Sequence, residues 1–89
     1  MLEKQLTIVN KLGLHARASA KLVQHASHYS SDIKIIRDIK EVNGKSIMGV
    51  MMLAASKGTQ IILRINGEDE KDALDDLSTL IDNGFGEEN

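Results

Sequence analysis

The sequence contains no cysteine, no proline and no tryptophan, and only one tyrosine and one phenylalanine among its 89 residues. The lack of cysteine excludes disulfides, thiol nucleophiles and thiolate metal sites. With so few aromatic rings, the chain has almost no platform on which single-stranded nucleic acid could stack. A net charge of −2 also argues against a nucleic-acid binder, which needs a basic surface to neutralise phosphates. We therefore expect an aliphatic core and no nucleic-acid partner.

Long apolar runs are also missing. The longest one, residues 47–55, contains Gly49 and is far too short to span a bilayer. The first four residues lack the apolar segment of a signal peptide. We therefore expect a cytoplasmic protein without membrane insertion, folded as a single domain over residues 1–89.

Apolar and polar residues alternate in four short segments, and this pattern predicts strands. The four segments are residues 3–9, 32–37, 40–43 and 60–65. Helical spacing predicts helices over residues 16–28 and 47–53, and a last helix that starts at the acidic residues 68–70 and stops at Gly84. The order β-α-β-β-α-β-α predicts an α+β fold, an open-faced β-sandwich whose four-stranded antiparallel sheet carries three helices on one face.

Helical spacing also predicts which side chains are buried. In the first and last helices these are Ser19, Leu22, Val23, Ala26, Ala73, Leu74, Leu77, Leu80 and Ile81. The short middle helix has more apolar side chains than a surface helix can bury on one side. Val50 and Leu53 suit the core, which leaves Ile47, Met48 and Met51 partly exposed. These flexible side chains either fill the core or form a patch that docks several partners.

The most informative residue is His15, which follows Gly13 by two positions and precedes an alanine-rich helix that contains Arg17. If His15 lies just before the first helical turn, its imidazole is held over the free N–H groups of a helix N-terminus, where an anion is favoured. A neutral histidine there is a nucleophile, and a phosphoryl group on it would be stabilised by Arg17. Alternatively, His15 only caps the helix.

A pair of histidines and a serine are further candidates for chemistry. His25 and His28 are one helical turn apart but lack a third ligand, so we expect solvated helix-face histidines and no metal site. Ser46 follows the Asn43-Gly44 turn and is predicted to be the N-cap of the middle helix. Position 49 is glycine rather than glutamate, so no reciprocal capping box forms.

Three segments resemble the HPr family, the histidine phosphocarriers of the bacterial phosphoenolpyruvate:sugar phosphotransferase system. Residues 13–17, Gly-Leu-His-Ala-Arg, resemble the active-site signature of this family. Residues 43–51 resemble its regulatory-serine segment, and Lys57-Gly58 with residues 66–70 resembles the entry to its last strand and last helix. These matches fall in register along essentially the whole chain.

The resemblance implies that Enzyme I phosphorylates His15 on Nδ1 and that the group then passes to a histidine of a IIA-type domain. Arg17 and the backbone N–H groups of Ala16 and Arg17 would hold the phosphoryl group. No cofactor is implied, and the protein would be a relay rather than a turnover enzyme. Ser46 would be phosphorylated by an HPr kinase/phosphorylase. The protein would be a monomer. The residues that the resemblance implies for docking partners are Ala16, Arg17, Ala20, Ile47, Met48 and Met51.

The chain departs from the family at Ala18, where most members have proline. Proline presets the backbone of a first helical turn, so we expect a softer helix start here with function retained. Residues 10–12 and 83–88 resemble the nitrogen-related branch of the family, NPr, whereas the Ser46 segment resembles the sugar branch. The sequence therefore does not decide which protein accepts the phosphoryl group from this chain. The alternative function is a regulatory binding module without phosphorelay, against which the intact His15 and Arg17 argue.

Overall fold

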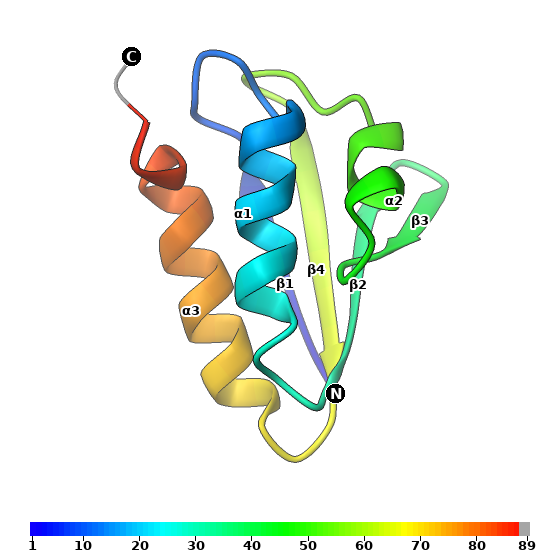
Figure 1. Ribbon diagram of the computed structural model, residues 1–89. Helices are drawn as coiled ribbons and strands as arrows, with labels where there is room; N and C mark the ends of the chain where they lie inside the picture. Colours follow the sequence, from blue (N-terminus) through cyan, green and yellow to red (C-terminus); the bar gives the residue numbers. More distant parts are fainter. Residues whose placement is uncertain (88–89) are drawn as a thin grey trace.

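The computed structural model describes residues 1–87, and its elements follow the predicted order β-α-β-β-α-β-α (Figure 1). The strands are β1 (Leu2–Thr7), β2 (Asp32–Arg37), β3 (Lys40–Asn43) and β4 (Gln60–Asn66). The helices are α1 (Ala16–Ala26), α2 (Ile47–Met52) and α3 (Glu70–Asp82), followed by a 3-10 turn, η1 (Gly84–Gly86). Within residues 1–87, none of the helices is long and apolar enough to cross a membrane.

The four strands form one antiparallel sheet in the order β1-β4-β2-β3. The last strand therefore lies between the first and the second. Its Ile61 pairs with Leu6 of β1, and its Leu63 pairs with Ile35 of β2, so that aliphatic side chains from three strands share one face. The register follows from the alternation in the sequence, because a slip by one residue would turn every apolar side chain to the other face.

The helices cover this aliphatic face and leave the other face of the sheet open (Figure 1). Leu22 of α1, Val50 of α2 and Leu77 of α3 are fully buried in the same core as the strands. On the open face, Arg64 of β4 forms ion pairs with Glu3 of β1 at 2.5 Å and with Glu41 of β3 at 2.7 Å. The predicted open-faced β-sandwich is confirmed.

Several predicted element ends were wrong by one to two residues, and tertiary pairing explains one of them. We predicted β1 over residues 3–9, but its ladder ends where Thr7 meets Gln60, the first residue of β4. The next residue, Ile8, bonds instead to the loop before β4, through its N–H to Thr59 and its carbonyl to Gly58. The first helix ends at Ala26 rather than at residue 28, because Ser27 is its C-cap. The middle helix ends at Met52, one residue early.

Helices α1 and α3 are joined by a polar contact that the sequence did not predict. The Asp76 carboxylate lies 3.0 Å from His25 Nδ1 and accepts a hydrogen bond from the Tyr29 hydroxyl at 2.8 Å. This hydrogen bond to the carboxylate raises the pKa of Tyr29 to about 12. His25 is half-buried and paired, so our expectation of a solvated side chain was wrong. His28 is exposed as predicted, but it lies beyond the end of α1 and not on a helix face.

Asp69 ties the start of α3 to the loop before β2. Its carboxylate accepts hydrogen bonds from the N–H groups of Ser30, at 2.8 Å, and Ser31, at 3.0 Å, and from both serine hydroxyls. It makes no side-chain cap on its own helix. These bonds, led by that from the Ser31 hydroxyl, lower the pKa of Asp69 from 3.8 to about 2. The acidic start of α3 therefore fixes a neighbouring loop by hydrogen bonds, in addition to any favourable interaction with the helix dipole.

The lowered pKa predicts how the stability contributed by Asp69 depends on pH. A carboxylate with a depressed folded-state pKa stabilises fully above its unfolded value, near 3.8, and loses that contribution as pH falls through about 2. Replacing Asp69 by asparagine should lower stability above pH 4, and the difference from wild type should shrink below pH 4. Denaturant titrations from pH 7 to 2 measure it, with Asp75→Asn, an exposed position on α3, as control. A difference between wild type and Asp69→Asn that does not change with pH would contradict the assignment.

Candidate functional site

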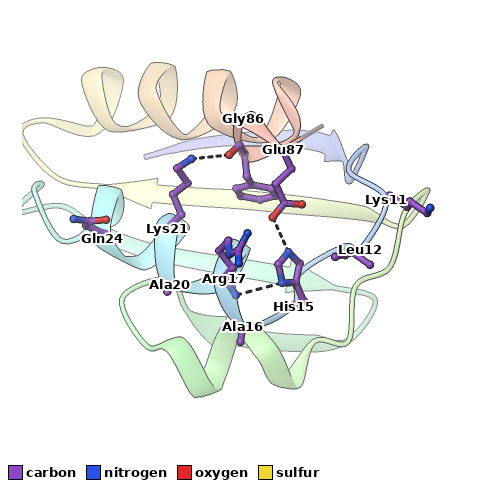
Figure 2. Close-up of a pocket in the computed structure, with 11 residues that line it drawn as sticks. Lys11, Leu12, His15, Ala16, Arg17, Ala20, Lys21, Gln24, Gly86 and Glu87 are labelled. Carbon is purple, nitrogen blue, oxygen red and sulfur yellow. Dashed lines mark hydrogen bonds and ion pairs between the residues drawn. The ribbon is translucent and has the colours of Figure 1, made fainter. Parts of the chain in front are cut away.

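His15 is the N-cap of α1, as the sequence predicted. Its backbone is extended, with φ −74° and ψ −178°, and the next residue begins the helix. The ring turns back toward the helix, where Nδ1 accepts a hydrogen bond from the backbone N–H of Arg17 at 3.3 Å (Figure 2). The first N–H groups of a helix have no intrahelical acceptor, so His15 Nδ1 lies where an anion is favoured.

The loop before His15 is held at several points by hydrogen bonds. Leu14 donates its backbone N–H to the Ala55 carbonyl at 2.8 Å, and its own carbonyl accepts from the Ser19 hydroxyl at 3.0 Å. Asn10, which is fully buried, donates a side-chain N–H to the Gly13 carbonyl at 2.8 Å. Gly13 has φ +65°, a conformation that favours glycine. The backbone that carries His15 is therefore tied to both the protein core and α1.

A carboxylate from the far end of the chain contacts the other ring nitrogen. Glu87 Oε2 lies 2.6 Å from His15 Nε2, and Glu87 Oε1 accepts from the Asn10 side chain at 3.0 Å (Figure 2). The Asn10 hydrogen bond, with the His15 ring and the charge of Arg17, outweighs burial and lowers the pKa of Glu87. Glu87 could not be predicted as a partner of His15, because 72 residues separate the two in the sequence.

The segment after α3 brings Glu87 to this place. Gly84, with φ +62°, ends α3 where a stop was predicted, and the chain then turns toward the start of α1 (Figure 1). Phe85 enters the core, where it is 1% exposed, although its φ is +59°. Its carbonyl accepts a hydrogen bond from the Lys21 ammonium at 2.7 Å. The buried phenylalanine was a signal in the sequence that this segment packs on the domain.

An open hollow surrounds His15 and carries positive side chains. Its lining residues are Lys11, Leu12, His15, Ala16, Arg17, Ala20, Lys21, Gln24, Phe85, Gly86 and Glu87. Arg17 and Lys21 come from α1 on the side that faces Glu87 (Figure 2). The hollow therefore combines a histidine, helix N–H groups and cationic side chains, which suits a phosphate-sized anion.

The remaining predicted residues lie on α2, outside this hollow. Ser46 is the N-cap of α2, as predicted, and its hydroxyl oxygen accepts from the Gly49 N–H at 3.1 Å. Ile47, Met48 and Met51 are 43%, 75% and 41% exposed, whereas Val50 is buried. The structure thus places Ala16, Arg17 and Ala20 around His15 and puts the apolar residues of α2 on the neighbouring helix. Within residues 1–87, no three histidine or carboxylate side chains gather to hold a metal.

Comparison with known families and proteins matches this chain along nearly its full length. Residues 2–83 match the PTS-HPr family model, described as the PTS HPr component phosphorylation site. The chain is 58% identical to the phosphocarrier protein HPr of Xylella fastidiosa, over 99% of each chain. It is 55% identical to the protein of that name from Cupriavidus necator, over 98% of each chain.

Solved structures share the fold as well. A crystal structure of HPr from Thermoanaerobacter tengcongensis is 48% identical and superimposes with a TM-score of 0.96, over the whole of both chains. Crh, the Bacillus subtilis catabolite repression protein, is 42% identical with a TM-score of 0.76, over 94% of this chain and 97% of its own. That Crh structure is described as a domain-swapped dimer, and another structure of the Thermoanaerobacter protein is described as a dimer.

The geometry of Gly13 predicts that a methyl group there disturbs the site. A Cβ at Gly13 would lie 2.4 Å from the Ala55 carbonyl oxygen, the acceptor of the Leu14 N–H. Gly58 also has a positive φ, but a Cβ there would meet nothing within 4 Å. Gly13→Ala should therefore cost at least about 1 kcal/mol more unfolding free energy than Gly58→Ala, because both changes carry conformational strain and only the first adds a clash. Denaturant melts of the two variants measure the difference, and equal losses would contradict it.

Proposed function

The chain belongs to the HPr family of phosphocarrier proteins, and on that basis we propose that it accepts a phosphoryl group on His15 Nδ1 from phosphorylated Enzyme I. The phosphoryl group then passes to a histidine on a IIA-type domain. The observation that carries this proposal is the position of His15 as the N-cap of α1, with Nδ1 directed at the Arg17 N–H. The nucleophilic nitrogen and the groups that receive its phosphate lie together.

The start of α1 supplies the groups that would bind the phosphoryl group. The backbone N–H groups of Ala16 and Arg17 belong to the first turn, where a helix has no internal acceptors for them. The exposed Arg17 guanidinium adds a planar, permanently charged donor. Ala18 contributes another N–H in this turn, which the proline of most family members lacks. Its methyl group is fully buried, so the helix start is packed even without proline.

The partner surface that we propose combines α1 and α2. Ala20 is exposed on α1, and Ile47, Met48 and Met51 are exposed on α2, which packs against α1. Flexible apolar side chains beside a charged site adapt to partners of different shape. Enzyme I, IIA-type domains and an HPr kinase/phosphorylase would use this face in turn.

Ser46 is the proposed site of regulation, because it opens the helix that carries this face. Phosphorylation there would add about −1.5 to −2 charges at a helix N-terminus, where the dipole tolerates them. The fold would therefore keep its stability. A partner that covers Met48 and Ile47 would have to bury or approach the new charge, which is costly without a matching cation.

Loading of His15 is the first expected outcome. Incubation with phosphoenolpyruvate and a cognate Enzyme I should raise the intact mass by one phosphate, in an adduct that is acid-labile and base-stable. His15→Ala should abolish the adduct, whereas His28→Ala, which removes an exposed histidine from the region after α1, should leave it intact. Loading that survives His15→Ala would refute the assignment. A wild-type chain that is never loaded would favour the regulatory binding module instead.

A negative charge at Ser46 should slow this loading without unfolding the protein. We expect Ser46→Asp to reduce the rate of Enzyme I-dependent loading by about tenfold or more, through like-charge repulsion and desolvation. Its melting temperature should stay within a few degrees of wild type. Ser27→Asp adds the same charge at the C-cap of α1, the opposite end from His15, and should load normally.

Salt distinguishes the two causes of the Ser46 effect. Added salt should partly restore loading of Ser46→Asp if repulsion through solvent dominates, and should not if burial of the charge dominates. A contradicting result would be that Ser46→Asp and the enzymatically phosphorylated protein both load at the wild-type rate. Ser46 would then have its capping role alone.

A further inference from the structure

The segment after α3 is fixed over the start of α1 by contacts at three successive points. Phe85 is buried in the core, its carbonyl accepts from Lys21, and the Glu87 carboxylate accepts from Asn10. Asn10 is itself buried, and the protons of its side-chain nitrogen go to Gly13 and to Glu87. The same amide therefore holds the loop before His15 and the carboxylate that contacts the His15 ring.

The two ring nitrogens of His15 consequently have partners of opposite kind. Nδ1 faces a donor, the Arg17 N–H, and so presents its lone pair. Nε2 faces an acceptor, Glu87 Oε2 at 2.6 Å, and so carries the proton. Each contact alone selects the same form of the ring, with the proton on Nε2 and the lone pair on Nδ1 directed at the helix N-terminus.

We infer that Glu87 is a positioning residue for His15, which holds the Nε2–H form of the ring and balances the charge that the ring gains on phosphorylation. This inference rests on the proposed function. A carboxylate that orients a reactive histidine through its second nitrogen is a recurrent arrangement in nucleophilic and metal-binding sites.

The transfer step shows why a carboxylate helps at this place. The lone pair of His15 Nδ1 forms a bond to the phosphorus of a phosphohistidine donor, and the donor's P–N bond breaks with its electron pair going to the donor nitrogen. His15 keeps the proton on Nε2, so its ring becomes cationic. The carboxylate at 2.6 Å faces that charge from the side opposite to the incoming phosphoryl group. When the group passes on, the ring returns to its neutral form without moving a proton.

The pKa of Glu87, which lies well below neutral pH for an ordinary glutamate, is lowered further, first by the Asn10 hydrogen bond, and this agrees with a carboxylate that stays ionised beside the ring. The Arg17 guanidinium lies on the side of α1 that faces Glu87, and its charge contributes to the lowered pKa of that carboxylate (Figure 2). The helix N–H group on the Nδ1 side and the carboxylate on the Nε2 side together polarise the ring in the direction that phosphoryl acceptance requires.

The contact is tested first in the unphosphorylated protein by nuclear magnetic resonance. In 15N-labelled wild type, the His15 Nε2–H proton should be visible and protected from exchange with water, since it is held in a short hydrogen bond. Glu87→Ala should remove this protection and shift both ring nitrogens. Glu68→Gln, which removes the charge of an exposed glutamate before α3, should leave them unchanged. Identical ring signals in wild type and Glu87→Ala would overturn the inference.

The charge is tested by loading kinetics with Enzyme I and phosphoenolpyruvate. Glu87→Gln keeps the length of the side chain but loses the charge and one of the two acceptor oxygens, so it can no longer accept from both Asn10 and the His15 ring. It should load about tenfold more slowly at saturating Enzyme I, because a charge-assisted hydrogen bond is roughly twice as strong as a neutral one. Its melting temperature should stay within a few degrees of that of Glu68→Gln, and this comparison separates the effect on loading from a loss of structure.

The outcomes distinguish this inference from the function on which it rests. A wild-type protein that is never phosphorylated overturns the proposed function before any variant is compared. If the wild type is loaded on His15 and Glu87→Gln loads at the same rate as Glu68→Gln, only the role of Glu87 is overturned. Slow loading confined to Glu87→Gln, together with loss of the protected Nε2–H in Glu87→Ala, supports both.

Discussion

The site depends on one buried amide, that of Asn10. Its nitrogen donates to the Gly13 carbonyl, which holds the loop, and to the Glu87 carboxylate, which holds the end of the chain over His15. Burying an amide is costly unless its donors are bonded, so both partners are strongly favoured once Asn10 is enclosed. One enclosed side chain thereby fixes the two segments that approach His15 from opposite ends of the sequence.

The electrostatics of the site follow from this arrangement. The N-terminus of α1 makes the Nδ1 side of the ring favourable for anions, and Glu87 makes the Nε2 side favourable for a cation. A bare helix terminus disfavours a positive ring, although a phosphoryl acceptor must become positive in transfer. The carboxylate opposite the helix reconciles these demands without adding bulk where a phosphoryl group would bind.

Much of the fold was predictable because its signals are local. Alternation in β2 and β4 placed Ile33, Ile35, Ile61, Leu63 and Ile65 in the core, and helical spacing did the same for Leu22 and Leu77. The end of β1 was misplaced because a strand ends where its partner does, and β4 begins some 50 residues later. The pairing of His25 was unpredictable for the same reason, since its partner Asp76 belongs to a different helix.

The sequence by itself determined the order of the elements, the buried faces, the two helix caps and the His15 signature, because these arise from residues a few positions apart. Tertiary structure alone decided the strand order β1-β4-β2-β3 and brought Glu87, Asn10 and His15 together. The physical reason is that a hydrogen bond needs two groups within about 3 Å. When 72 residues separate them, only the packing of the whole core can set that distance.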